Sequence, residues 1–299
     1  MEFVFFVEVL AGGLLAGVMY ALVALGFVLI YKASGVFNFA QGAMVFFAAL
    51  TFVSLTEAGW NFWLALVVTL AAMVLLGIAT ERVVLRPLVN QAPITLFMAT
   101  IGLTFVLEGL SQMIWGSQPH GLELGVPDVP MEWLSQRWNV NISQFDLFAA
   151  LVAGVLVAVL ALFFQKTRIG RALRAVADDH QAALAVGIPL QHIWAIVWAV
   201  AGFVALVAGL MWGVRNGVQY ALTFVALKAL PVLILGGFES ILGAIVGGLI
   251  IGATEKLAEV YLGPFVGGGI ESWFAYVVAL VFLLFRPEGL FGEKIIDRV

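Results

Sequence analysis

The sequence predicts an all-α membrane protein: a polytopic bundle of about eight or nine transmembrane helices with two related halves and discontinuous helices. Hydrophobic residues make up 63% of the 299 residues and charged residues only 11%, whereas a soluble globular domain carries about 25% charged residues. Apolar runs long enough to cross about 30 Å of hydrocarbon recur along the chain. The composition therefore excludes a soluble globular protein.

The first span is expected at residues 10–31. Gly13 and Gly17 stand there at the GxxxG spacing that brings membrane helices into close contact. We therefore interpret these glycines as a helix-packing surface.

A polar segment follows the first span, with Ser34, Asn38 and Gln41 expected on one helical face between glycines. Amides in lipid need hydrogen-bond partners, so this face either bonds to a neighbouring helix or lines a water-filled path. The glycines favour a broken or re-entrant helix, in which freed backbone groups line a cavity.

The second span is expected to end near Thr56 and the third near Ala79. The fourth, at about residues 94–115, carries one polar stripe at three- and four-residue steps: Thr100, Thr104, Glu108, Ser111 and Gln112. Glu108 lies well inside the apolar run, and an intramembrane carboxylate is costly enough to be a functional candidate. The alternative is a buried structural carboxylate with a hydrogen-bond or ion-pair partner.

Residues 116–144 form an acidic stretch with few Lys and Arg, which predicts a position outside the cell. This stretch either receives a soluble partner or caps the fold. The fifth span, residues 145–164, leads to the basic segment 166–189. The positive-inside rule places that segment in the cytosol, because four basic residues follow the span closely: Lys166, Arg168, Arg171 and Arg174.

An amphipathic helix is expected within this basic segment, from Arg171 to Gly187, where glycine and the following Pro189 stop it. Its apolar or small face would consist of Leu173, Val176, Ala177, His180 and Leu184. Such a helix either lies on the inner leaflet or docks to a cytosolic partner. The stripe lacks the Phe and Trp that anchor helices in the interface, which favours a partner.

The sixth span is expected at residues 190–212, and the next apolar stretch, residues 222–235, is short and contains Lys228 and Pro231. Short, proline-broken segments indicate discontinuous helices near a transport path. Lys228 and Glu108 fall at comparable depths, so we expect them to pair. Spans at about residues 241–258 and 273–285 complete the chain, and the basic residues after them predict a cytosolic C-terminus.

An internal repeat is indicated because GVFNFAQGAMV from Gly35 aligns with GGFESILGAIV from Gly236. The whole chain, 1–299, is then one transmembrane domain. It contains half 1 at about residues 10–165, the cytosolic segment 166–189 and half 2 at about residues 190–299. Repeated halves with broken helices are typical of transporters, with the site between them.

Several kinds of chemistry find no support in the sequence. It contains no GxxxxGK[ST] loop for ATP and no HExxH motif, and its three histidines are scattered. The net charge of −4 gives no basic face for nucleic acid. We expect no enzyme activity, no metal site and no cofactor bound by this chain.

The chain resembles the permeases of branched-chain amino acid ABC importers, the LivH type, over nearly its full length. The resemblance rests on four stretches: GxxxGxxYALxALG from Gly13, GxxNFAQG from Gly35, GRAxRAxAxD from Gly170 with AAxxxGI from Ala182, and FRPxGLFG from Phe285. Many relatives carry His where this chain has Gln41, so a protonation role there does not carry over.

The resemblance implies a multi-pass subunit of the bacterial inner membrane. It would pair with a second homologous permease, dock two cytosolic ABC ATPase subunits and receive substrate from a periplasmic binding protein. The segment 166–189 would be the coupling segment, whose ATPase contacts are Arg171, Leu173, Arg174, Val176, Asp178, Asp179, His180, Leu184 and Gly187.

The path-lining residues that this interpretation assigns are polar groups from several spans: Tyr20, Asn38, Gln41, Thr104, Glu108, Ser111, Gln112, Lys228 and Glu239. The expected substrates are branched-chain or related amino acids, and members that carry urea or short amides are an alternative. A different class also fits the sequence: a stand-alone secondary transporter with Glu108 as proton or sodium carrier.

Overall fold

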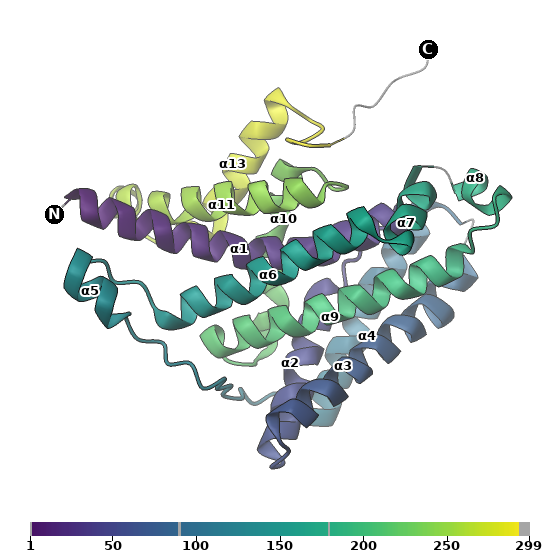
Figure 1. The fold of residues 1–299 in the computed structure, drawn as a ribbon, viewed down its shortest axis with the longest axis horizontal. Coiled ribbons are helices and arrows are strands. Elements are labelled where there is room, and N and C mark those ends of the chain that lie inside the picture. Colours follow the sequence, from purple (N-terminus) through teal and green to yellow (C-terminus); the bar gives the residue numbers. More distant parts are fainter. Residues whose placement is uncertain (1, 89–90, 179, 293–299) are drawn as a thin grey trace. The chain divides into compact units, whose positions relative to one another are not determined.

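The computed structural model describes residues 2–88, 91–178 and 180–292 (Figure 1). These residues are predominantly helical. The long helices are α1 (Glu2–Ser34), α2 (Gln41–Glu57), α3 (Phe62–Ala79), α4 (Pro93–Trp115), α6 (Gln144–Lys166), α9 (Leu190–Asn216), α10 (Val225–Gly236), α11 (Ile241–Tyr261) and α13 (Glu271–Phe285). The short ones are a π-helix η1 (Thr80–Leu85), η2 (Arg86–Leu88), α5 (Glu132–Trp138), α7 (Arg168–Asp178), α8 (His180–Ala185), η3 (Tyr220–Phe224) and α12 (Gly263–Val266).

Six of the described helices are long and apolar enough to cross a membrane, and three shorter apolar helices accompany them. The long ones match the predicted first, third, fourth, fifth and sixth spans and the glycine-rich span at 241–258. The shorter ones are Gln41–Glu57, Tyr220–Gly236 and Glu271–Phe285. The predicted polytopic helical bundle is therefore confirmed.

The described residues form two compact units. Unit 1 takes its residues from Met1–Ala24, Glu123–Ala158 and Leu227–Val299, and unit 2 from Leu25–Leu122 and Val159–Ala226. Helix α1 belongs to unit 1 at its beginning and to unit 2 at its end. Each unit therefore combines segments from both predicted halves.

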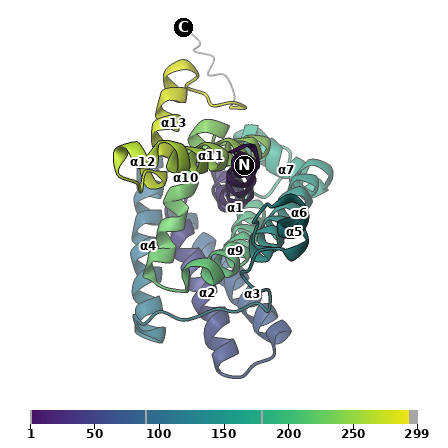
Figure 2. The same ribbon diagram turned by 90° about the vertical axis from the view of Figure 1, so that its left-hand side faces the viewer.

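In unit 1, α1 and α11 pack closely through glycines. A Cβ at Gly13 would lie 2.7 Å from the carbonyl oxygen of Gly252, and one at Gly17 would overlap the carbonyl of Gly248. Both glycine pairs have GxxxG spacing, and Figures 1 and 2 show the two helices side by side. The packing role predicted for Gly13 and Gly17 is confirmed, and its partner is α11.

In unit 2, α9 packs against both α2 and α3, while α2 also contacts α4. Close approach again depends on glycine: a Cβ at Gly209 of α9 would lie 2.6 Å from the Val45 carbonyl oxygen of α2. On the other side, Gly77 of α3 lies against the Trp198 backbone. The centre of α9 is buried accordingly.

The two stretches of the predicted repeat have the same backbone plan. Helix α1 ends at Ser34 before Gly35, which has φ +65°, and α2 begins at Gln41. Helix α10 ends at Gly236 before Gly237, which has φ +99°, and α11 begins at Ile241. A helix, a left-handed glycine and a new helix thus follow in both places, as a broken helix requires.

The break corrects one detail of the sequence interpretation. Ser34, Asn38 and Gln41 were expected on one helical face, but Ser34 ends α1, Asn38 lies in the turn and Gln41 begins α2. The second predicted discontinuity is a 3₁₀ turn, η3, followed by the short helix α10 with Pro231 inside it. The break that the glycines indicated is present, whereas Pro231 lies inside α10 without interrupting it, so the predicted proline break is wrong.

Candidate functional site

Unit 1 contains a charged cluster, which we define as Tyr20, Lys228, Glu255, Lys256 and Glu271. The Tyr20 hydroxyl donates to Glu255 Oε1 at 2.9 Å, and Lys228 Nζ lies 3.4 Å from the same oxygen. Lys228 Nζ is also 3.7 Å from Glu271 Oε1, and Lys256 Nζ donates to Glu271 Oε2 at 2.7 Å. Two ammonium and two carboxylate groups therefore form one connected network.

The glycine seam between α1 and α11 explains why Tyr20 meets Glu255. Each residue follows a seam glycine, Gly17 or Gly252, by three positions and so lies on the same helical face. Glu255 is only 2% exposed. The side chains of Lys228, Glu271 and Lys256 are 35%, 33% and 32% exposed, so the cluster is closed at Glu255 and open at the other three.

Glu259 fixes the position of Glu271 within this cluster. Its two carboxylate oxygens accept hydrogen bonds from the backbone N–H groups of Gly269, at 2.8 Å, and Glu271, at 2.9 Å. These bonds hold the loop between α11 and α13 and satisfy N–H groups at the start of α13. The Glu271 carboxylate therefore begins a helix whose start is anchored to α11.

In unit 2, the turn between α1 and α2 is built by side chains that bond to its own backbone. Asn38 Oδ1 accepts from the Ala40 N–H at 3.1 Å, and Asn38 Nδ2 donates to Gln41 Oε1 at 3.2 Å. Thr100 of α4 accepts from the Phe39 N–H and donates to the Phe37 carbonyl oxygen, both at 3.1 Å. Asn38 and Gln41 are fully buried, so these amides stabilise the break.

The polar stripe of α4 is buried for most of its length. Thr104 donates to its own helix, and Glu108 Oε2 accepts from the Tyr220 hydroxyl of η3 at 3.2 Å. Glu108 is 8% exposed and Ser111 is fully buried, whereas Gln112 is exposed. Gln112 therefore leaves the stripe, and the other members face the interior of unit 2.

The expected pairing of Glu108 with Lys228 is not among the contacts that the structure describes. Glu108 has Tyr220 as its partner, and Lys228 has Glu255 and Glu271. Glu108 belongs to unit 2 and Lys228 to unit 1, so their pairing stays a prediction. Glu239 is half-buried in the turn between α10 and α11.

The segment predicted to couple to an ATPase is helical and attached to its own spans. Thr167 caps α7 by accepting from the Gly170 N–H at 3.1 Å. Arg174 donates to the carbonyl oxygens of Phe164, at 2.7 Å, and Gln165, at 3.2 Å, at the end of α6. Lysine and arginine side chains satisfy the last carbonyls of a helix in this way. Helix α7 is thus fixed to the end of α6.

The apolar residues of this segment differ in their exposure. Leu173 and Val176 are buried against their own chain, and α7 packs on α9. Leu184, Arg171 and Gly187 are exposed, as is Val186 at 75%. Leu173 and Val176 thus support the segment from beneath, which corrects their expected outward position.

The helix stop predicted at Gly187 is confirmed by its φ of +83°. Helix α7 starts at Arg168, earlier than predicted, and the described residues are helical on both sides of residue 179, up to Ala185. Asp179 and the side chains of Asp178 and His180 lie outside the described residues.

The start of α9 gives this segment a second attachment. Gln191 accepts a hydrogen bond from Arg86 of η2, and Arg86 Nε lies 3.8 Å from Glu81 Oε1 of the π-helix η1. The segment is therefore held at α6 through Arg174 and at the end of α3 through Arg86.

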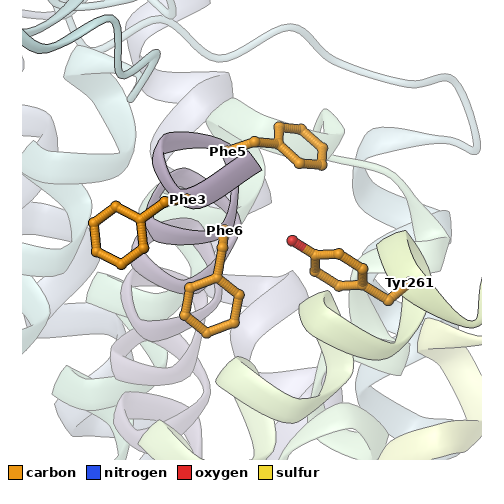
Figure 3. A pocket seen from close by; sticks show the side chains of 4 residues that line it. All are labelled: Phe3, Phe5, Phe6 and Tyr261. Carbon is orange, nitrogen blue, oxygen red and sulfur yellow. The ribbon is translucent and has the colours of Figure 1, made fainter. Parts of the chain in front are cut away.

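A separate pocket lies in unit 1 between the start of α1 and the end of α11. It is lined by Phe3, Phe5, Phe6 and Tyr261, and Figure 3 shows the Tyr261 hydroxyl directed into the space that the phenylalanines border. The Phe5 and Tyr261 ring centroids are 6.5 Å apart. Three phenylalanine rings and a single hydroxyl give this pocket a mainly apolar lining. Among the described residues, no group of three His, Cys, Asp or Glu could hold a metal ion.

Four residues of these sites were missed in the sequence. Glu255 and Lys256 lie inside the glycine-rich span, so the rule that selected Glu108 could have found them. Tyr220 and Glu271 stand at the ends of apolar segments, where polar residues are ordinary, and no sequence signal distinguishes them.

The chain is similar to a family of membrane permeases over most of its length. The model of the family described as "Branched-chain amino acid transport system / permease component" matches residues 9–286. The permease protein LivH of the high-affinity branched-chain amino acid transport system of Escherichia coli K12 is 27% identical, with 100% of this chain and 99% of that protein covered.

Two other relatives widen the comparison. The permease protein BraD of the corresponding Pseudomonas aeruginosa system is 28% identical, with 100% and 99% covered. The fructose import permease protein FruF of Bifidobacterium longum is 24% identical, with 90% of this chain and 75% of that protein covered. With its spans, broken helices and basic connector, this chain belongs to the family of branched-chain amino acid transport system permease components.

Proposed function

We propose that this chain is the membrane-spanning subunit of an ABC importer that carries branched-chain or related amino acids across the bacterial inner membrane. The observation that carries this proposal is similarity along the entire chain to permeases named for that transport. Energy would come from ATP hydrolysis on partner subunits, with no enzyme activity and no cofactor on this chain. FruF shows that relatives are also named for other solutes, so urea or short amides stay an alternative.

The proposed assembly contains a second homologous permease, two cytosolic ATPase subunits and a periplasmic binding protein. The basic segment 166–189 and the C-terminus would face the cytosol. On this orientation the exposed apolar residues at the end of the segment, Leu184 and Val186, would dock on an ATPase.

The attachments of the segment support a coupling role. Arg174 fixes it to α6, Leu173 and Val176 pack beneath it, and Gln191 at the start of α9 is held by Arg86. An element fixed at both ends transmits displacement, whereas a flexible loop would absorb it. Movement of an ATPase would therefore reach the spans α6, α9 and α3 and produce alternating access.

The test is co-purification of the ATPase with Val186→Asp, because an unpaired carboxylate in an apolar contact is costly. We expect at least about tenfold less retained ATPase and ATP-driven uptake. The matched control is Val266→Asp, the same change at a 62% exposed valine at the end of α12, which on this orientation would lie outside. This control should retain the ATPase.

Two outcomes contradict the proposal at different levels. Full retention of the ATPase by Val186→Asp would show that docking lies elsewhere. Uptake by this chain alone, driven by a proton or sodium gradient and without any ATPase, would overturn the importer and support a secondary transporter.

A further inference from the structure

The charged cluster of unit 1 is larger than helix packing requires. Four helices contribute to it: α1, α10, α11 and α13. Burying an ion pair seldom stabilises a protein more than apolar side chains of equal volume would, and ionisable groups inside a membrane are costly. The glycine seam already joins α1 to α11. The cluster therefore points to recognition of a ligand with charges of its own.

The charged cluster is exposed at its longest ion pair. Lys228 and Glu271 are separated by 3.7 Å, the longest of its ion pairs, and both side chains are about one-third exposed. The other contacts of these two residues are shorter: Lys228 to Glu255 at 3.4 Å and Glu271 to Lys256 at 2.7 Å. A ligand can thus replace the Lys228–Glu271 contact while each residue keeps its inner partner.

The backbone around Lys228 supports the same conclusion. Lys228 lies on α10, which follows a 3₁₀ turn and contains Pro231. Unusually short apolar segments of this kind are a sequence pointer to the substrate site of a transporter. Glu271 is fixed independently, because Glu259 anchors the start of α13. The two opposite charges are therefore held by separate, preorganised elements.

We propose that Lys228 and Glu271 bind the zwitterionic headgroup of an amino acid, with its carboxylate on Lys228 and its ammonium group on Glu271. The inference rests on the function proposed above and adds the two residues that recognise the substrate's charges. Glu255 and Tyr20 are positioning residues for Lys228, and Lys256 is the positioning residue for Glu271. Recognition is of the headgroup, so side chains of different size are accepted.

Ligands that lack one charge test this proposal. The purified transporter containing this chain is placed in lipid nanodiscs without the binding protein, and saturation-transfer NMR measures L-leucine, L-leucinol without the carboxylate, and 4-methylpentanoate without the ammonium group. Each charge-assisted bond contributes about 1.5–3 kcal/mol, or at least about tenfold in affinity. Wild type should therefore prefer leucine about tenfold over both analogues.

Two variants should relax different preferences. The Lys228→Met variant should bind leucine and leucinol equally well, and should still bind leucine more tightly than 4-methylpentanoate. The Glu271→Gln variant, which keeps the shape of the side chain, should bind leucine and 4-methylpentanoate equally well. It should still bind leucine more tightly than leucinol. A purely structural role would weaken all three ligands together, and Glu271→Gln remains decisive even if Lys228→Met does not fold.

The matched control is Tyr276→Phe. It removes a hydroxyl that donates to the Leu227 carbonyl of α10 at 2.6 Å without changing any charge, so both preferences should persist. The inference is overturned if wild type, or both charge variants, show unchanged relative binding of the three ligands. ATP-driven leucine uptake in proteoliposomes with the binding protein is measured in parallel. Uptake without headgroup preference in the binding experiment overturns this inference and leaves the proposed function intact. Absence of all amino acid uptake overturns both the inference and the proposed function.

Discussion

Both units bury polar side chains inside membrane helices, but these side chains have different kinds of partner in each unit. The charged cluster of unit 1 joins α10, α11 and α13 through ion pairs, and the Tyr20 hydroxyl adds α1 by a hydrogen bond to Glu255. In unit 2 most of the buried polar groups are amides and hydroxyls, and the carboxylate of Glu108 has a phenol as partner. The exception is Glu81 of η1, which pairs with Arg86. The repeat gives both units a break after glycine, yet Asn38 of one stretch aligns with Glu239 of the other.

This difference indicates a division of roles. Neutral groups that satisfy local backbone can stabilise a turn at little cost, because nothing charged leaves water. Paired charges make every partner dependent on the others. Unit 1 should therefore be sensitive to loss of a single charge, and unit 2 should tolerate neutral replacements.

The largest effect is expected from Glu255→Leu, which leaves the Lys228 ammonium without its nearest carboxylate. Breaking a buried pair by removing one partner costs about 3–5 kcal/mol of unfolding free energy. The double variant Glu255→Leu with Lys228→Leu should recover most of this loss, since the pair Lys256–Glu271 remains balanced. Unfolding in mixed micelles measures the free energy of unfolding of both variants. Equal losses of this free energy in the single and the double variant would contradict the network.

A smaller effect is expected from Gly13→Val at the α1–α11 seam. The added side chain overlaps the Gly252 backbone, and overpacking costs about 1–3 kcal/mol. Gly12 is the matched control, because a Cβ there meets nothing within 4 Å. The same unfolding measurement should show Gly12→Val close to wild type; similar losses at both positions would mean that the seam does not limit packing.

In unit 2, Thr100→Val should destabilise the α1–α2 break by about 1–2 kcal/mol, because the Phe39 N–H and the Phe37 carbonyl oxygen lose their partner. Thr104→Val, one turn away, loses only a bond to its own helix and should be nearly neutral. Hydrogen exchange of the Phe39 amide provides the local measurement. Unchanged protection in Thr100→Val would contradict the assignment.

The smallest effect is expected from Glu108→Gln. The amide oxygen still accepts the Tyr220 hydrogen bond, so the unfolding free energy should change by less than about 0.5 kcal/mol. ATP-driven uptake should persist. Abolished uptake with normal folding would favour the rival interpretation, in which Glu108 carries a proton or sodium ion.

The spans and their interruptions were predictable because they depend on local signals. The apolar runs of α4 and α6 end at Trp115 and Lys166, and Gly35 marks the break between α1 and α2, whereas Pro231 does not interrupt α10. Gly13 and Gly17 also revealed a packing surface, although the sequence did not identify α11 as its partner.

The side-chain partners were less predictable because they depend on which helices are neighbours. Depth alone suggested Glu108 with Lys228, and it gave no sign of Tyr220 and Glu255, the partners that these two residues have within their own units. Likewise, the stripe of Leu173 and Val176 suits a groove on another protein and the side of α9 equally well. An amphipathic pattern shows that one face of a helix is buried, but it does not show which surface covers that face.

The balance of the charged cluster has an electrical consequence. Moving one elementary charge through the membrane potential changes the energy by about 2.3 kcal/mol per 100 mV. Two lysines and two glutamates that shift together transfer no net charge, and an amino acid held between them adds none. Rearrangement of this region would therefore proceed at the same rate in a polarised and a depolarised cell, leaving ATP as its energy source.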